Sequence, residues 1–247
     1  MVDLGNVTNS TGAALNTASN NAGVTTFLRP EDGAFDPSNK KDFYFVTTNS
    51  FTSPSRMWRL RFTDILNPEL GGTITAVLDG TEGQKMFDNF TFDNYGHALL
   101  QEDVGNNVHI GKMWQYTIAT DDLKLIAKHD ENRFITGVPN FLTQDEEASG
   151  IIDMEKILGP GMFLLVDQAH YSIPGEVYEG GQFLAYYNPD TYASSLAVTG
   201  VTDNAIEKSS VKLYPNPTGD EATISMMLEK YVLIYFYVKK LVLRFQA

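Results

Sequence analysis

Two stretches of this chain share one pattern at a nearly fixed spacing. The segment 31–36, Glu-Asp-Gly-Ala-Phe-Asp, is followed by an aromatic and β-branched run and then by Met57-Trp58. The segment 88–93, Asp-Asn-Phe-Thr-Phe-Asp, starts 57 residues later and leads to a similar run and to Met113-Trp114. A further step of similar size arrives at Asp-Glu-Glu, residues 145–147. Repeats of roughly 40 to 60 residues built from short strands are typical of β-propeller blades.

The run of predicted strands agrees with this period. Short aromatic and β-branched runs alternate with turn residues from about residue 27 to residue 189, which predicts an all-β sandwich, barrel or propeller. With the repeat, we expect a partial β-propeller of about three blades, fewer than the roughly four to eight that close a ring. One helix-like stretch stands at 153–158. The predicted strands are 43–48, 58–62, 73–78, 98–101, 113–118, 123–127, 163–166 and 182–187.

Charge and cysteine content limit the classes of partner and of chemical site that the chain can have. The chain has 31 acidic and 18 basic residues, a formal net charge of −13. This balance argues against a nucleic-acid partner and favours either a bound cation or simply high solubility. It has no cysteine, which excludes disulfides, thiolate metal sites and a cysteine nucleophile. The longest apolar run, 231–238, is far shorter than the roughly 20 residues of a membrane-spanning helix. The N-terminus lacks the pattern of a signal peptide, so we expect no signal peptide within these residues.

Three ordered blocks resemble one enzyme family. Residues 27–36, residues 87–103, and residues 147–150 with 166–170 are similar to blocks of the PhoX alkaline phosphatase family. The resemblance covers about 24–190. It implies a secreted β-propeller that hydrolyses phosphate monoesters with calcium and iron held by carboxylates on the channel axis. The family's iron centre uses a cysteine, which this chain lacks, so calcium carries over more directly than iron.

Acidic residues at the starts of the repeats are the candidate metal ligands. Hard cations such as Ca²⁺ prefer several oxygen ligands, and neighbouring carboxylates repel one another unless a cation neutralises them. In a propeller each blade begins near the central channel, so we expect these acids to converge on the axis. The alternative is that they only favour local hairpin turns. The candidate metal ligands are Glu31, Asp32, Asp88, Glu102, Asp103, Glu146 and Glu147.

Four residues are candidates for catalysis. Arg29 is suited to clamp a phosphate through bidentate hydrogen bonds, or else to form an ion pair with its neighbouring acids. His170 is suited to bind metal or substrate, or else to serve a structural role. Glu31 and Glu147 complete the catalytic set as metal-binding carboxylates. The chain contains no nucleophile elbow, Walker loop or His-Glu-x-x-His motif.

The C-terminal part predicts a different module. We expect a loop over 1–24, blades over 25–192, a linker over 193–210 and a sorting domain over 211–247. The stretch Leu-Tyr-Pro-Asn-Pro at 213–217 closely resembles the start of the type IX secretion sorting domain of Bacteroidetes. That resemblance implies a small β-sandwich, the type IX secretion machinery as partner, and a secreted or cell-surface location. The apolar run 231–238 departs from the family pattern, so we expect a truncated or frame-disrupted module. That run is also an aggregation site if it stays unpaired.

These observations favour a metal-dependent hydrolase acting on a small-molecule phosphate ester at an axial carboxylate–calcium site. Two alternatives stay open. One is a non-catalytic secreted propeller in which calcium ties blades together and a face binds a partner or glycan. The other is a propeller esterase or lactonase that uses one metal.

Overall fold

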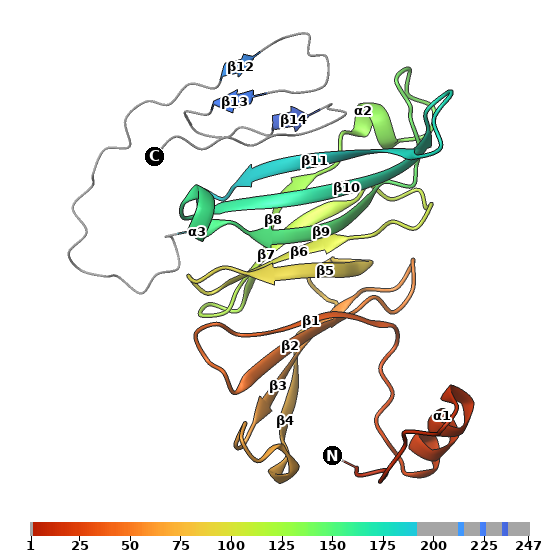
Figure 1. Cartoon of the computed structure of the whole chain (residues 1–247), viewed down its shortest axis with the longest axis vertical. Coiled ribbons are helices and arrows are strands. Elements are labelled where there is room, and N and C mark those ends of the chain that lie inside the picture. The colour runs from red at the N-terminus through yellow and green to blue at the C-terminus, as the bar shows by residue number, and fades with distance from the viewer. Residues whose placement is uncertain (1, 192–211, 215–222, 226–233, 237–247) are drawn as a thin grey trace, which may run out of the picture. The chain divides into compact units, whose positions relative to one another are not determined.

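The fold is described from a computed structural model (Figure 1). The structure describes residues 2–191, 212–214, 223–225 and 234–236. The chain divides into two compact units, residues 1–86 and 87–247. The first unit contains one four-stranded antiparallel sheet, with its strands in the sequence order β1-β2-β3-β4. Its elements are α1 (Gly12–Asn21), β1 (Pro30–Phe35), β2 (Asp42–Thr47), β3 (Arg56–Phe62), η1 (Pro68–Leu70) and β4 (Gly72–Leu78).

The second unit holds two more sheets of the same kind, in the orders β5-β6-β7-β8 and β9-β10-β11-β14. The short strands β12 (Lys212–Tyr214) and β13 (Thr223–Ser225) pair with each other. The other elements are β5 (Phe87–Phe92), β6 (His97–Glu102), β7 (Lys112–Thr117), β8 (Asp122–Lys128), α2 (Glu131–Phe134), β9 (Glu147–Asp153), α3 (Glu155–Leu158), β10 (Met162–Ser172), β11 (Glu179–Tyr187) and β14 (Ile234–Phe236).

The internal repeat is confirmed between the first two sheets, strand by strand. In β1 the register against β2 shifts between Pro30 and Gly33, and in β5 the register against β6 shifts between Phe87 and Phe90. Each shift is a β-bulge, in which two residues of the first strand face one residue of the second. A second shift recurs in both Met-Trp pairs of the third strands. The two sheets therefore share their irregularities as well as their strand order.

The tryptophans of the repeat occupy matching places. Arg56 lies over the Trp58 ring, and Lys112 lies over the Trp114 ring, with the cation 5.7 and 5.5 Å from the ring centre respectively. The Trp58 indole N–H donates to Thr47 Oγ1 at 3.1 Å, and the Trp114 indole N–H donates to a carboxylate of the second strand at 2.8 Å. The equivalence of the two sheets extends to individual side chains.

The third sheet has the same first-strand irregularity. In β9 the register against β10 shifts where Ala148 pairs with Asp167 and Gly150 pairs with Val166. Its fourth strand is β14, which pairs with Phe183–Ala185 of β11. The expected domain boundary at residue 210 therefore does not separate β14 from this sheet. Part of the apolar run 231–238 is paired here instead of standing alone.

The structure confirms the all-β class, and every predicted strand overlaps an observed one. It differs from sequence expectation at the first strand of each sheet, because β1, β5 and β9 contain Asp, Asn, Gly or Glu, which have low strand propensity. It also differs at 1–24, where α1 replaces part of the expected loop. The Thr11 hydroxyl caps this helix by accepting from the Ala14 N–H at 3.2 Å.

A hydrophobic core joins the two sheets of the second unit. Strand β9 packs against β5 and β6, so the beginnings of the two sheets lie side by side. Burial of aliphatic and aromatic side chains from both sheets stabilises this arrangement and fixes the strand ends that carry the acidic residues. The core consists of Leu99, Met113, Ile151, Phe163, Leu165 and Leu184.

Candidate metal centre

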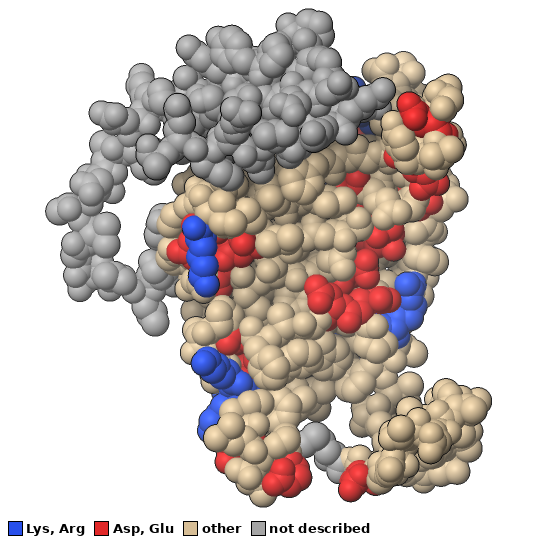
Figure 2. Space-filling model, in the orientation of Figure 1, with Lys and Arg blue, Asp and Glu red and all other residues tan. Residues whose placement is uncertain are grey.

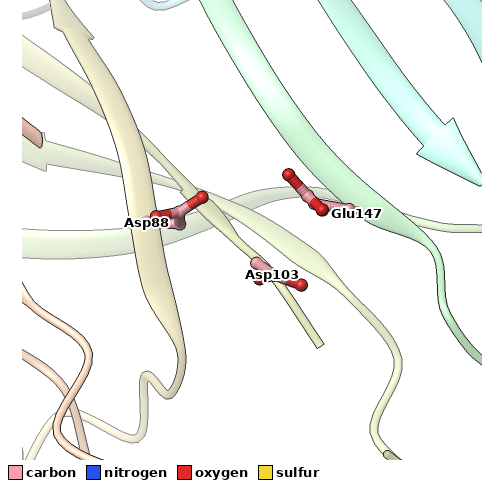
Figure 3. A group of neighbouring side chains, drawn as sticks. All are labelled: Asp88, Asp103 and Glu147. Atoms are coloured by element: carbon pink, nitrogen blue, oxygen red, sulfur yellow. The ribbon is translucent and has the colours of Figure 1, made fainter. Parts of the chain in front are cut away.

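Three carboxylates of the second unit converge. Asp88 comes from the bulge of β5, Asp103 directly follows β6, and Glu147 begins β9. Each contributes one carboxylate oxygen to a group in which all three oxygens lie within 4.8 Å of one another (Figure 3). All three residues are partly buried. This carboxylate triad spans two sheets, because Asp88 and Asp103 belong to one and Glu147 to the other.

Backbone geometry sets the triad. Asp103 and Glu147 form an isolated antiparallel bridge, which holds the end of one sheet against the start of the next. The bulge in β5 places Asp88 and Asn89 together opposite Gln101, and an extra residue of this kind redirects side chains. The Asp103 carboxylate also accepts from the Gly105 N–H at 2.8 Å, which orients it. The triad is therefore held by main-chain pairing rather than by a flexible loop.

The three carboxylates of the triad carry like charges, which repel one another. Burial, and then the charge of Asp103, raises the pKa of Glu147, while its hydrogen bond with His170 works in the other direction. Three carboxylates at this spacing repel unless a proton or a cation compensates them. Ca²⁺ takes six to eight oxygen ligands, so the triad supplies part of a coordination shell that water can complete. The donor set, all oxygen, fits a hard cation.

His170 supports the triad from one side. Its Nε2 lies 3.3 Å from Glu147 Oε2, and its Nδ1 lies 2.8 Å from Glu179 Oε2. Its φ of 47° falls in the left-handed region, which is uncommon for a residue other than glycine. Partial burial lowers its pKa, but the hydrogen bonds to Glu179 and Glu147 outweigh this effect and the net pKa is raised. His170 is placed to orient Glu147 rather than to join the triad itself.

The neighbouring acids Glu102 and Glu146 point elsewhere. Glu102 is fully buried and accepts from the Trp114 indole N–H and from His109 Nε2, both at 2.8 Å. Glu146 is also fully buried, and one of its oxygens accepts from the Gly111 N–H at 3.0 Å. Adjacent residues of an extended chain point to opposite sides, so the pairs Glu102-Asp103 and Glu146-Glu147 each send only one member to the triad.

The remaining candidates lie in the first unit. Glu31 contacts Arg29 at 3.4 Å and accepts from the Thr48 hydroxyl at 3.3 Å. Asp32 accepts from the N–H of Gly33 at 2.7 Å. Arg29 also lies over the ring of Phe51, 5.4 Å from its centre. The structure thus gives Arg29 the ion pair with a neighbouring acid that was the alternative to phosphate contact.

Two buried residues with unusual surroundings escaped the sequence argument. Burial raises the pKa of Asp167 to about 7, and the charge of Glu146 adds to this effect. Burial lowers the pKa of His129 to about 4. Burial likewise raises the pKa of Glu146 to about 7. The one sequence signal for Asp167 was an acid directly after the apolar run 162–166; His129 had none.

Acidic side chains are more prominent than basic ones on the face shown in Figure 2, as the net charge of −13 leads one to expect. Within the described residues, no helix is long and apolar enough to cross a membrane. The sequence matches no protein-family model, no curated protein and no solved structure in the comparisons with known proteins.

Proposed function

We propose that this chain binds Ca²⁺ at the triad of Asp88, Asp103 and Glu147. The convergence of three partly buried carboxylate oxygens within 4.8 Å carries the proposal. An all-oxygen set of this kind suits Ca²⁺ better than Zn²⁺, which prefers nitrogen and sulfur ligands. Bound Ca²⁺ would remove the mutual repulsion of the carboxylates and link the sheet of β5–β8 to β9.

We further propose that the bound cation serves hydrolysis of a phosphate monoester, as the resemblance to PhoX phosphatases implies. The cation would supply positive charge to a phosphoryl oxygen and acidify a bound water. His170, whose Nε2 lies 3.3 Å from Glu147 Oε2, would hold Glu147 in position and exchange a proton at the edge of the site. The carboxylates of Asp88, Asp103 and Glu147 would hold the cation in this role.

The same proposal includes that the sheets are blades of a β-propeller and that the chain is secreted. Three four-stranded sheets with strands in sequence order, and the packing of β5 against β9 within the second unit, support this architecture. The motif at 213–217 supports recognition by the type IX secretion machinery and a secreted or cell-surface location. Strand β12 contains the first two residues of that motif, and β13 follows it in the chain.

A second candidate is a non-catalytic module. The triad spans two sheets, so a cation there would cross-link them whether or not it meets a substrate. In this case calcium would raise the melting temperature and the chain would hydrolyse nothing.

One experiment separates these functions. Release of phosphate from p-nitrophenyl phosphate and the melting temperature are measured for the chain with Ca²⁺ and with a chelator. We expect Asp88→Asn and Glu147→Gln to lose both the calcium-dependent activity and the calcium-dependent rise in melting temperature. Asp122→Asn, which removes one charge from an exposed position at the start of β8, is the matched control and should change neither.

If Ca²⁺ raises the melting temperature of the wild type but not of the two triad variants, and the wild type hydrolyses no phosphate ester, the non-catalytic module is selected. If Ca²⁺ changes the melting temperature of no protein in the series, including the wild type, the calcium site itself is contradicted.

A further inference from the structure

A small cavity lies in the second unit, apart from the triad. It has a volume of about 60 Å³ and lies among β7, β8, α2 and the strands β9–β11. Most of the exposed surface of its wall is apolar. Its polar and charged lining residues are His129, Asp167, Gln101, Gln182, Asp130, Lys112, Lys128 and Arg133. The apolar lining includes Met113, Ala127, Phe134, Ala148, Leu165 and Leu184.

Asp167 is the unusual member of this wall. It is 2% exposed, and among the described residues neither of its carboxylate oxygens has a hydrogen-bond partner. Buried carboxylates are normally paired, hydrogen-bonded or bound to a metal, because burial of an uncompensated charge is strongly unfavourable. Asp167 therefore points to a group that belongs in the cavity.

His129 faces the same space. Its Nε2 lies 3.7 Å from Asp167 Oδ1, which is too long for a hydrogen bond. Its Nδ1 has no hydrogen-bond partner within the described part of the chain. The two side chains are thus close without contacting each other, at a separation that an ion bound to both atoms would bridge.

The imidazole is held in this position by its neighbours. The backbone N–H of His129 donates to the carbonyl of Gly111 at 2.9 Å, and the Phe134 ring packs edge-on against the imidazole at 5.5 Å between centres. A Cβ atom on Gly111 would lie only 2.5 Å from His129 Nδ1, so this position leaves room for the ring only because it is glycine. Gly111 also donates its N–H to Glu146 at 3.0 Å, so the backbone segment that pairs with His129 also holds a second buried acid.

We propose that Asp167 and His129 bind a divalent transition-metal ion of the Zn²⁺ class, as a second metal site distinct from the calcium triad. A mixed set of one carboxylate oxygen and one imidazole nitrogen suits Zn²⁺ and its neighbours and disfavours Ca²⁺. A cavity of about 60 Å³ admits an ion with one or two waters and is too small for most organic ligands.

The surrounding charges agree with a cation in this cavity. Glu146 is fully buried, and its second oxygen also has no hydrogen-bond partner among the described residues, so two acids are available to balance a divalent ion. The basic residues at the rim are engaged elsewhere. Lys128 pairs with Glu131, Lys112 lies over the Trp114 ring, and Arg133 lies 3.8 Å from Asp130.

The test uses the full chain after removal of metals with a chelator. Zn²⁺ binding is measured by calorimetric titration and by metal analysis of the desalted protein. The visible absorption of added Co²⁺ reports the change from the six-coordinate aqueous ion to a protein site of lower coordination number. We expect the wild type to bind one Zn²⁺ per chain at this site. We expect Asp167→Asn and His129→Gln each to weaken binding at least tenfold, and the Co²⁺ signal to fall away in His129→Gln.

Two controls keep this site apart from the triad. Asp88→Asn should bind Zn²⁺ as the wild type does while losing its response to Ca²⁺, and Asp122→Asn should leave both unchanged. The far-ultraviolet circular dichroism of each variant reports whether it folds. The proposal is overturned if the wild type binds no Zn²⁺, if binding survives both substitutions at this site, or if Asp88→Asn abolishes it.

Discussion

The sheets β1–β4 and β5–β8 have the same backbone pattern, but the acidic residues in their first strands lie next to different side chains. Glu31 and Asp88 are the first bulge residues of the two sheets. The residue that follows β2 is Thr48, and the equivalent residue after β6 is Asp103. In the first sheet a hydroxyl therefore donates to the bulge acid, at 3.3 Å, whereas in the second sheet another carboxylate approaches it.

This difference shows what makes a cation site in such a sheet. A bulge acid on its own finds local partners, as Glu31 does with Thr48 and Arg29. The site arises where the second strand also ends in an acid and a neighbouring sheet adds a third. The carboxylate after the second strand, rather than the acidic bulge, is the distinguishing feature.

The position one residue earlier extends the comparison to the third sheet. Thr47, Glu102 and Asp167 each pair with the residue just before the first-strand bulge. Thr47 accepts from Trp58, Glu102 accepts from Trp114 and contacts His109, and Asp167 has no hydrogen-bond partner among the described residues. The same place in three sheets thus carries a neutral side chain, a satisfied acid and an unsatisfied one.

The largest effect is expected at Asp167. Its pKa in the folded chain is raised from 3.8 to about 7, so its contribution to stability is fully present below about pH 4 and is lost as the pH rises toward 7. In chelator-treated protein, Asp167→Asn should be more stable than the wild type above pH 7, by up to roughly 4 kcal/mol. Urea unfolding of both proteins between pH 4 and 8 measures this.

His129 provides an internal check on that pH series. Its lowered pKa, about 4, makes stability fall as the pH drops from 6.5 toward 4, and it does so in both proteins. It therefore cancels when the two curves are subtracted. A difference curve that is flat from pH 4 to 8 would show that ionisation of Asp167 does not destabilise the metal-free chain.

The next effect concerns the residue after the second strand. Asp103→Thr gives the second sheet the residue of the first and leaves two of the three carboxylates. We expect its Ca²⁺ affinity to fall by about 100-fold, or roughly 2.7 kcal/mol, and its stability without Ca²⁺ to rise as repulsion falls. Calorimetric titration measures the affinity. Unchanged affinity would mean that Asp103 is not a ligand.

Substitution of the two tryptophans tests the difference between Thr47 and Glu102, which accept the two indole hydrogen bonds. Trp114→Phe removes a donor from a fully buried carboxylate, which should cost roughly 1–3 kcal/mol of unfolding free energy. Trp58→Phe removes a donor from a hydroxyl and should cost roughly 0.5–1.5 kcal/mol. Urea unfolding at pH 7 gives both values. Equal losses would remove the distinction drawn between Thr47 and Glu102.

The smallest effect is expected at Arg29. Its side chain is about half exposed and its ion pair with Glu31 is 3.4 Å long, so Arg29→Ala should cost less than about 0.5 kcal/mol. The same variant is informative for function. If Arg29 binds the phosphate of the substrate, loss of its guanidinium should raise the KM for the phosphate ester strongly. A stability loss well above this value would show that the pair is more than a surface contact.

The sequence predicted the fold in outline because strand signals lie in local side chains. The apolar and β-branched runs of β2, β3 and β10 are recognisable without any tertiary information. The first strands were missed because Asp88 and Glu147 have low strand propensity, and only pairing with the second strands makes them extended.

The site was predicted in part for a related reason. The residue type and spacing identified Asp88, Asp103 and Glu147, but the alternation of side chains along the chain separates Glu102 and Glu146 from them. The meeting of Asp167 with His129 depends on packing between two sheets. No local pattern around either residue predicts it.

The central claim is that Asp88, Asp103 and Glu147 share one Ca²⁺. A crystal structure of the chain grown with Ca²⁺, with anomalous diffraction data, tests it most directly. We predict an anomalous peak about 2.3–2.6 Å from a carboxylate oxygen of each of the three residues. Calcium-saturated crystals in which the three carboxylates surround no such peak would contradict it.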